Sequence, residues 1–427
     1  MKISKLHIES FRHLENLDFD FTYPQDFHIL EKRGKPLSKI CFIGQSASGK
    51  TGLLELIYTS ICSFYDLRLI SLDKVKVVGA YNNFDIEFDF INNLKSYSYR
   101  KSNIAIDRNK YDFHHGNYNG GGEDVLDGEN KLFYFTAGIL SKSNLKLFEE
   151  QTVILIEKYK SIKAKFRKEQ YTALKFDDNV EDAVWLGLLE DNVNYLQKSL
   201  QFASELINSG SILDATMNDK INKWKKENVN PLLDFSEKFN SILNKINLEV
   251  DLINTKNIAP LKHKITDQNI PIQFASTGTK QLLLTSLLLY KLKTKDSIIL
   301  VDEPERSLYP DIQMEIIEHY QKIAPEAQLI IATHSPFIAA SFEPEERFIL
   351  SFNEEGKVVV RRGTSPIGDD PNDMLENDFG IDYNNQFGKD AYKKYLKLKE
   401  DLGKEKNLDK KKDLLLKTVK LGDTYNF

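Results

Sequence analysis

Residues 44–51 read GQSASGKT and fit the pattern G-x-x-x-x-G-K-[ST], which is typical of a phosphate-binding loop. The glycines let the backbone wrap closely, so that amide N–H groups and a helix N-terminus face the phosphates. Lys50 supplies a mobile positive charge for the β- and γ-phosphates of ATP, and the Thr51 hydroxyl is a ligand for Mg²⁺. The predicted nucleotide contacts in this loop are Gly44, Ser46, Ala47, Ser48, Gly49, Lys50 and Thr51.

Two adjacent acids, Asp302 and Glu303, follow the apolar run 298–301. An apolar run of this length predicts a buried strand, which delivers both carboxylates at its end. Downstream of a phosphate-binding loop, Asp302 is expected to hold Mg²⁺, directly or through water. Glu303 is expected to act as the general base that polarises the attacking water.

His334 ends a second apolar run, 329–332, about 30 residues after the two acids. A histidine at a strand end usually has a structural role. Its place after the acids instead favours a contact with the γ-phosphate, so we predict that His334 is a catalytic residue. Pro336 fits the first turn of a following helix.

The elements that must position these residues alternate between strand and helix. Strands are expected at 39–43, 132–135, 297–301, 328–332, 347–351 and 358–361, and helical spacing begins at Thr51. This alternation predicts an α/β core with a mostly parallel sheet. The N-terminal segment 3–21 alternates like a strand pair, and further strands are expected between 74 and 100.

Residues 141–255 are dominated by helical spacing and contain few glycines, which predicts an insertion of three or four helices that splits the core. We therefore predict four parts: an N-terminal core half with the phosphate-binding loop, the helical insertion, a C-terminal core half, and a helical tail. Their expected ranges are 1–140, 141–255, 256–365 and 366–427.

Composition narrows the class of protein. The chain has 427 residues, 41% of them hydrophobic and 28% charged, with a net charge of −5. No apolar stretch approaches the length of a membrane span, the N-terminus lacks a signal-peptide core, and only two cysteines are present. We therefore expect a cytoplasmic protein without membrane contact.

His114 and His115 lie in a Gly-rich stretch, which indicates a plain loop more than a metal site.

A family resemblance rests on these motifs. Asp302-Glu303-Pro304-Glu305 with Pro310 shortly after resembles ABC-type ATPases of the SMC, RecF and OLD group. The opening Ile8-Glu9-Ser10-Phe11-Arg12 is similar to that group's first strands, which implies that Arg12 reaches a phosphate. The segment Ser276-Thr277-Gly278-Thr279 resembles the ABC signature. The resemblance implies that Ser276 and Gly278 close over the γ-phosphate of a second copy, hence a homodimer or higher homo-oligomer. Thr279 departs from the acid or glutamine usual there.

The closing segment 371–381, followed by a charged helical tail, resembles ATPase subunits of Septu-type antiphage systems. This implies a regulatory ATPase that acts with a separate effector protein such as a nuclease. A DNA-repair ATPase without an effector and an ATP-bound scaffold with little turnover are the alternatives.

The tail itself is rich in lysine. Between Lys389 and Lys420 there are 12 lysines and 6 acids, which fits either a solvated helix or a nucleic-acid contact. The acids Asp369, Asp370, Asp373 and Glu376 are expected in a loop, away from the buried strands that carry nuclease metal ligands, and the tail lacks histidine. We therefore expect no nuclease site in this chain.

Overall fold

The computed structural model describes residues 2–66, 86–92, 95–100, 103–106, 109–112, 131–162, 173–209, 217–254, 256–381, 386–405 and 407–425. They form two compact units, Met1–Asp369 and Asp370–Phe427. Residues 74–85 of the region where further strands were predicted, and His114 and His115, lie outside the described residues. None of the helices in the described ranges is both long enough and apolar enough to cross a membrane.

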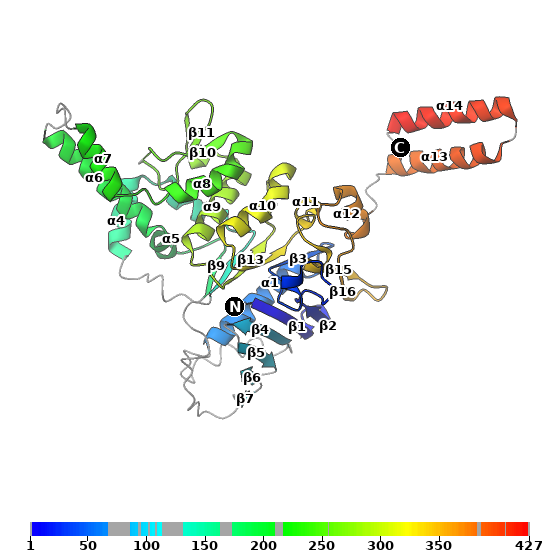
Figure 1. Cartoon of the computed structure of the whole chain (residues 1–427), viewed down its shortest axis with the longest axis horizontal. Coiled ribbons are helices and arrows are strands. Elements are labelled where there is room, and N and C mark those ends of the chain that lie inside the picture. Colours follow the sequence, from blue (N-terminus) through cyan, green and yellow to red (C-terminus); the bar gives the residue numbers. More distant parts are fainter. Residues whose placement is uncertain are drawn as a thin grey trace. The chain divides into compact units, whose positions relative to one another are not determined.

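A seven-stranded sheet forms the centre of the first unit (Figure 1). Its order is β16-β15-β3-β14-β13-β8-β9, and every neighbouring pair is parallel except β15–β16. The inner strands are buried on both faces, which is why they read as unbroken apolar runs. The strands are β3 (Lys39–Gly44), β8 (Leu132–Phe135), β9 (Ala173–Phe176), β13 (Ile298–Asp302), β14 (Gln328–Ala332), β15 (Arg347–Phe352) and β16 (Val358–Arg362). The predicted α/β class with a mostly parallel sheet is confirmed.

A six-stranded antiparallel sheet lies beside it, in the order β2-β1-β4-β5-β6-β7. Helix α1 (Lys50–Asp66) packs between the two sheets, because its apolar residues share one core cluster with strands of both. The predicted N-terminal strand pair is present as β1 and β2. The strands are β1 (Lys2–Phe11), β2 (Leu14–Asp20), β4 (Ile86–Asn92), β5 (Lys95–Arg100), β6 (Asn103–Ile106) and β7 (Asn109–Asp112).

Three helices pack against one another: α8 (Leu233–Leu243), from the predicted insertion, and α9 (Thr277–Lys291) and α10 (Pro310–Ile323), from the C-terminal core half. Helix α9 is buried on nearly all sides, with buried residues at almost every position from Gly278 to Leu289. A helix that is apolar all round needs cover on all sides, and here the neighbouring helices supply it. A short helix, α11 (Pro336–Ala339), follows His334.

The expectation of a purely helical insertion is wrong in two places. Strand β9 pairs in parallel with β8 and extends the central sheet, and β10 (Leu248–Val250) is a strand as well. Strand β10 forms a small antiparallel sheet with β11 (Leu261–His263) and β12 (Asn269–Ile270), which lie after the predicted insertion. The helices between β8 and α8 are α3 (Lys142–Glu149), α4 (Thr152–Ile162), α5 (Asp182–Leu188), α6 (Glu190–Asn208) and α7 (Met217–Glu227). The division of the first unit at 140 and 255 stays a prediction.

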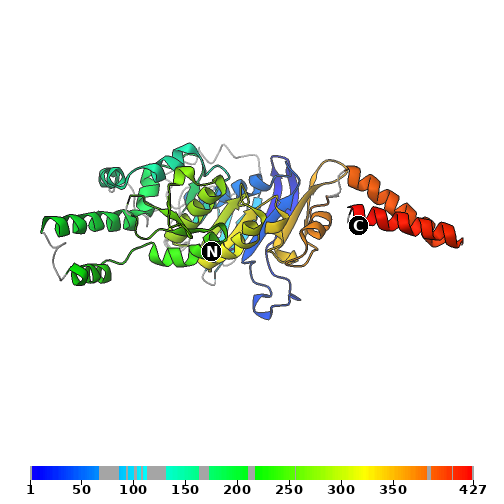
Figure 2. The ribbon, with the colours of Figure 1, turned by 90° about the horizontal axis from the view of Figure 1, so that it is seen from above.

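Helices α6 and α7 extend together away from the central sheet (Figures 1 and 2). They touch through stacked aromatic rings: the centroids of Phe202 and Trp224 lie 5.1 Å apart. The far half of α6 is solvated, with Leu200 and Ile207 exposed.

The second unit is helical: α12 (Pro371–Asn377), α13 (Gln386–Lys404) and α14 (Leu408–Tyr425), the last two forming a hairpin. The expectation that Asp373 and Glu376 lie in a loop is wrong. Asp370 caps α12 by accepting from the Asn372 N–H, and Pro371 occupies the first turn, so Asp373 and Glu376 are helical.

Candidate nucleotide-binding site

The candidate residues follow three neighbouring parallel strands. The phosphate-binding loop follows β3, His334 follows β14, and the acids end β13. Since β14 pairs with both β3 and β13, the carboxyl ends of all three strands meet at one edge of the sheet. Ligands of open α/β sheets bind at this edge.

The loop backbone wraps as its glycines allow. Gly44, Ala47 and Gly49 have φ of 147°, 64° and 96°. A Cβ on Gly44 would lie 2.1 Å from the Leu350 carbonyl oxygen, so only glycine fits there. Gln45, Ser46 and Ala47 are exposed at the tip, where their backbone is open to a ligand.

Lys50 begins α1 and is almost fully buried. Its Nζ donates to the carbonyl oxygens of Gly44 and Gln45, each at 2.9 Å. Burial lowers the pKa of Lys50 to about 8, while Asp302, Glu303 and Glu305 act in the opposite direction. The ammonium therefore lies inside the loop and close to the acids at the end of β13.

Thr51 and Asp302 form a pair of adjacent oxygen donors. The Thr51 hydroxyl donates to Asp302 Oδ1 at 3.2 Å. Burial raises the pKa of Asp302 to about 6; the Thr51 hydrogen bond opposes that rise, and the charges of Glu303 and Glu305 add to it. A hydroxyl and a carboxylate together suit a hard cation such as Mg²⁺.

Glu303 is held in an uncommon backbone conformation, with φ of 49°, and its N–H donates to the Ala332 carbonyl at 2.9 Å. Such a conformation costs energy and marks a constrained position.

The His334 side chain is exposed. Partial burial lowers the pKa of His334, the Lys50 charge lowers it further, and Glu303 raises it. The five residues Lys50, Thr51, Asp302, Glu303 and His334 thus share one site.

The segment that resembles a signature lies at the N-terminus of α9. Ser276 is its N-cap, and its Oγ accepts from the Thr279 N–H at 3.1 Å. Thr279 is buried and its hydroxyl lies 2.8 Å from Ser276 Oγ, so the residue that departs from the family pattern completes this cap. Gly278 packs against the loop after β13, where a Cβ would lie 2.2 Å from the Ser307 carbonyl oxygen.

Arg12 lies in the β1–β2 turn with φ of 56°, and its guanidinium pairs with Glu55 on α1 at 2.9 Å. It lies over the first turn of α1, 3.5 Å from a Cβ built on Gly52. Its predicted contact with a phosphate stays a prediction. The neighbouring His13 was not predicted: its Nε2 lies 3.1 Å from a Cβ built on Gly49, so its ring borders the loop.

Two further residues that sequence analysis did not single out connect the loops of this site. Glu305 accepts a hydrogen bond from the His334 N–H, and Gln313 bonds to both Leu308 and Ser335. The signal for Glu305 was present, since it is the third acid of the Asp-Glu-Pro-Glu run. Nothing in the sequence pointed to Gln313.

The cradle fits a nucleotide with Mg²⁺. Ser48 Oγ is fully buried in the loop and has no hydrogen-bond partner among the described residues. A buried polar atom without a partner is costly, and a phosphate oxygen would satisfy it. The hydrogen-bond donors available to the phosphates are therefore the Lys50 ammonium, the loop amides and the loop hydroxyls. The ligands available to the metal are the side-chain oxygens of Thr51 and Asp302.

This fold and this site define a P-loop ATPase. The profile of the AAA ATPase domain family matches residues 68–339, which is more than half of the chain. The chain belongs to that family. The matched range includes the acids and His334 and begins after the phosphate-binding loop, which the G-x-x-x-x-G-K-[ST] pattern identifies by itself.

The chain is also similar to the Septu protein PtuA of Bacillus thuringiensis, with 33% identity over 72 residues. That match covers 17% of this chain and 18% of PtuA, so the matched stretch spans less than a fifth of that relative.

Among solved structures, the SmcHead bound to the C-winged helix domain of ScpA has a TM-score of 0.42 at 12% identity, over 85% of this chain and 97% of that one. The SMC head domain of Thermotoga maritima has a TM-score of 0.40 at 10% identity, over 86% of this chain and 100% of that one.

Proposed function

We propose that the chain binds ATP with Mg²⁺ and hydrolyses it at the edge of the central sheet. The observation that supports this most directly is the meeting of Lys50, Thr51, Asp302, Glu303 and His334 at the ends of three adjacent strands. Each residue type has a distinct task in phosphoryl transfer, and the chemistry is mainly positioning and electrostatic stabilisation.

The loop amides and the N-terminus of α1 bind the phosphates, and Lys50 leaves the loop carbonyls to pair with the β- and γ-phosphates. Glu303 accepts a proton from the attacking water. His334 donates a hydrogen bond to the γ-phosphate. Thr51 and Asp302 would hold Mg²⁺, which would neutralise charge that develops on the phosphate oxygens.

We also propose that a second copy completes each site. Ser276 and Thr277 are exposed at the N-terminus of α9. The first N–H groups of a helix have no partner within the helix, and together with the helix dipole they suit an anion. Within its own chain the signature-like segment packs against Ser307. One loop and one such segment per chain make two sites across a two-fold interface.

The role that fits best is a regulatory ATPase of an antiphage defence or DNA-surveillance complex, with a separate effector such as a nuclease. The stretch shared with PtuA supports this assignment. The C-terminal hairpin supports a docking role, because it carries exposed apolar residues that its two helices leave uncovered. They are Tyr392, Leu396, Leu408, Leu415, Leu416, Val419 and Tyr425.

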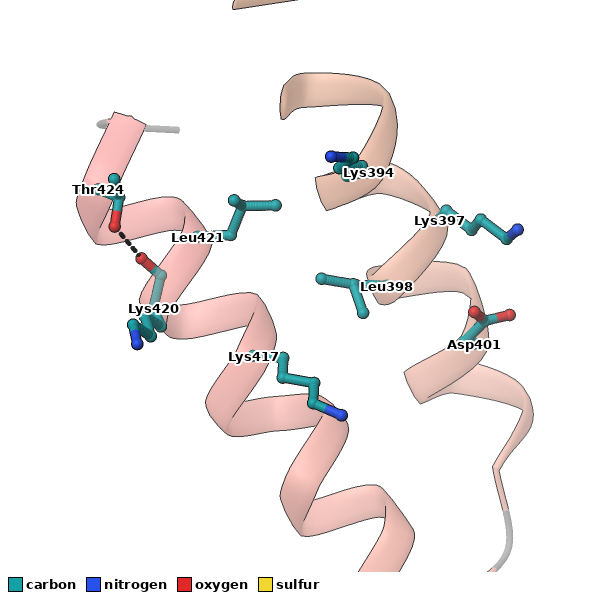
Figure 3. Close-up of a pocket in the computed structure, with 8 residues that line it drawn as sticks. All are labelled: Lys394, Lys397, Leu398, Asp401, Lys417, Lys420, Leu421 and Thr424. Atoms are coloured by element: carbon teal, nitrogen blue, oxygen red, sulfur yellow. Dashed lines mark hydrogen bonds between the residues drawn. The ribbon is translucent and has the colours of Figure 1, made fainter. Parts of the chain in front are cut away.

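Between the hairpin helices lies a groove of about 510 Å³. Figure 3 shows Leu398 and Leu421 pointing toward each other across it. Lysines 394, 397, 417 and 420 also line the groove, with Asp401 and Thr424. An apolar floor with a basic rim suits an amphipathic acidic segment of a protein partner.

The test of hydrolysis is steady-state ATPase activity of the purified chain with Mg²⁺, with EDTA, and with Glu303→Gln. We expect turnover that needs Mg²⁺ and falls by about 10²–10⁴-fold in the variant, while nucleotide binding persists. Near-normal turnover in Glu303→Gln would reject its role as general base. Purification of the native complex, with identification of co-purifying protein and nucleic acid, tests the effector.

A further inference from the structure

Glu305 joins the loops that follow two neighbouring strands. It lies on the loop after β13, and its Oε1 accepts the backbone N–H of His334, after β14, at 2.7 Å. The two residues are 29 positions apart in sequence. Burial raises the pKa of Glu305, and the hydrogen bond from His334 opposes that rise. A carboxylate in such a place is costly unless its hydrogen bonds are kept.

Gln313 on α10 makes a second connection between the same two loops. Its Nε2 donates to the Leu308 carbonyl at 2.7 Å, and its Oε1 accepts from the Ser335 hydroxyl at 2.5 Å. Ser335 Oγ in turn accepts from the Ile338 N–H and caps α11. Glu305 therefore holds the backbone N–H of His334, and Gln313 holds the side chain of the next residue, Ser335.

The backbone N–H of His334 is held by Glu305, whereas the imidazole is exposed. The nearby charges that act on the imidazole come from Lys50 and Glu303. Its position relative to Glu303 thus depends on how its backbone is fixed to the loop after β13. Glu303 itself is tied to β14 through the Ala332 carbonyl, so the general base and the histidine share one framework.

We propose that Glu305 is a positioning residue that fixes His334 against Glu303 for ATP hydrolysis, with Gln313 as a second brace. This rests on the proposed function of the same site. What the geometry requires of Glu305 is an acceptor oxygen for the His334 N–H. A glutamine can supply that oxygen and an alanine cannot.

The experiment compares Glu305→Gln and Glu305→Ala in the full chain, by ATPase rate, binding of a fluorescent ATP analogue and thermal melting. We expect Glu305→Ala to lower kcat by about 10–10²-fold with a much smaller change in binding, as for misplaced catalytic groups. Glu305→Gln should keep most of the activity. Glu318→Gln is the matched control, because it removes a carboxylate from the exposed surface of the same helix, α10, where Glu318 pairs with Lys322 at 2.7 Å.

The same variants in a His334→Ala background distinguish positioning from a separate role. If Glu305 acts through His334, Glu305→Ala adds little to the loss already caused by His334→Ala. An equal loss in both backgrounds overturns the proposal, and so does a Glu305→Gln variant as inactive as Glu305→Ala, which would indicate a role for the charge.

Should Glu305→Ala fail to fold, Gln313→Ala takes its place with the same expected loss and the same dependence on His334. A wild-type chain without Mg²⁺-dependent turnover contradicts the proposed function itself. A wild-type chain that hydrolyses ATP, with unaffected Glu305→Ala and Gln313→Ala variants, contradicts only the positioning role.

Discussion

The Thr51 hydroxyl donates to Oδ1 of Asp302 at 3.2 Å, which joins residues 251 positions apart in the chain. One residue begins the helix after β3 and the other ends β13, with β14 between the two strands. The bond therefore depends on the correct order of three strands. It holds two oxygen donors together in a place where Asp302 is only 6% exposed.

We predict that Asp302→Asn stabilises the nucleotide-free chain at neutral pH. Burial raises the pKa of Asp302 to about 6 from 3.8, so the folded chain binds more protons than the unfolded chain between these values. Stability is therefore lost as pH rises through this window, and the loss persists above it. The shift corresponds to about 3 kcal/mol at pH 7.5, which the neutral amide avoids.

The measurement is denaturant unfolding of both proteins at pH 4 and pH 7.5. The variant should exceed the wild type mainly at the higher pH, and Mg²⁺ with ATP should stabilise only the wild type. A variant that is less stable than the wild type at pH 7.5 contradicts the argument from burial.

A second prediction concerns proton uptake by Lys50. Because burial lowers its pKa to about 8, a growing fraction of the free chain carries a neutral amine as pH rises through that value. The triphosphate needs the ammonium, so binding above pH 8 takes up a proton and ATP affinity falls. Calorimetric titrations at pH 8.5 in two buffers of different ionisation enthalpy measure this uptake directly.

Lys50→Ala is the control for that measurement. It should bind ATP more weakly and show little binding-linked proton uptake over the same pH range. Equal uptake in the wild type and Lys50→Ala would assign the proton to another group.

Some strands of the central sheet can be predicted from the sequence and others cannot, because their burial patterns differ. Strands β3, β13 and β14 were predictable because they are buried on both faces and so carry unbroken apolar runs. Strand β9 was missed because its four residues, Ala-Leu-Lys-Phe, alternate in burial at the edge of the sheet and lie among helices. A pattern of only four residues can occur in a helix as well as in an edge strand, so it does not distinguish the two.

Within the site, residues at strand ends were predictable and contacts between loops were not. The ion pair between Arg12 and Glu55 and the packing of Gly278 on Ser307 need the tertiary structure. Ser307 itself has φ of 62°, a left-handed backbone conformation that is uncommon for serine and that the sequence does not predict.

That packing changes the choice of variant for testing the dimer. Gly278→Asp would place a negative charge in the signature-like segment, but any side chain at this position also collides with Ser307 of its own chain. Thr277→Glu is cleaner, because Thr277 is exposed in the first turn of α9, where a negative charge favours the helix but repels a phosphate. We predict loss of turnover and of ATP-dependent dimerisation with an unchanged or higher melting temperature.

Mixing Thr277→Glu with Lys50→Ala then tests sharing between subunits. A mixed dimer retains one complete site, made from the loop of the first chain and the signature-like segment of the second. An equal, randomly exchanging mixture should regain about a quarter of the wild-type rate, since half of the dimers are mixed and each has one site of two. No recovery, or an active monomer at saturating ATP in sedimentation, contradicts the shared site.

A further prediction is that any cleavage of nucleic acid is carried out by another polypeptide. The described residues of the C-terminal unit form a short helix and a helical hairpin, and its acids Asp373 and Glu376 lie on the helix α12 and do not follow a strand. We expect the purified chain to hydrolyse ATP and to leave DNA and RNA intact. Metal-dependent cleavage by the chain alone, removed by Asp373→Asn with Glu376→Gln, contradicts this.

A chain that ends after Ile381 separates the hairpin's role from that of the ATPase core. It keeps α12, whose Met374 is fully buried, and removes only α13 and α14. We expect it to bind ATP with wild-type affinity but to lose the partner that co-purifies with the full chain. Leu415→Asp with Leu416→Asp should cause the same loss in the full-length chain, because it places charge on the exposed apolar surface of α14. Lys410→Ala on the same helix is the matched control and should retain the partner. Retention of the partner by the shortened chain would place its docking surface elsewhere, whereas loss of ATP binding would mean that the hairpin is needed by the ATPase core.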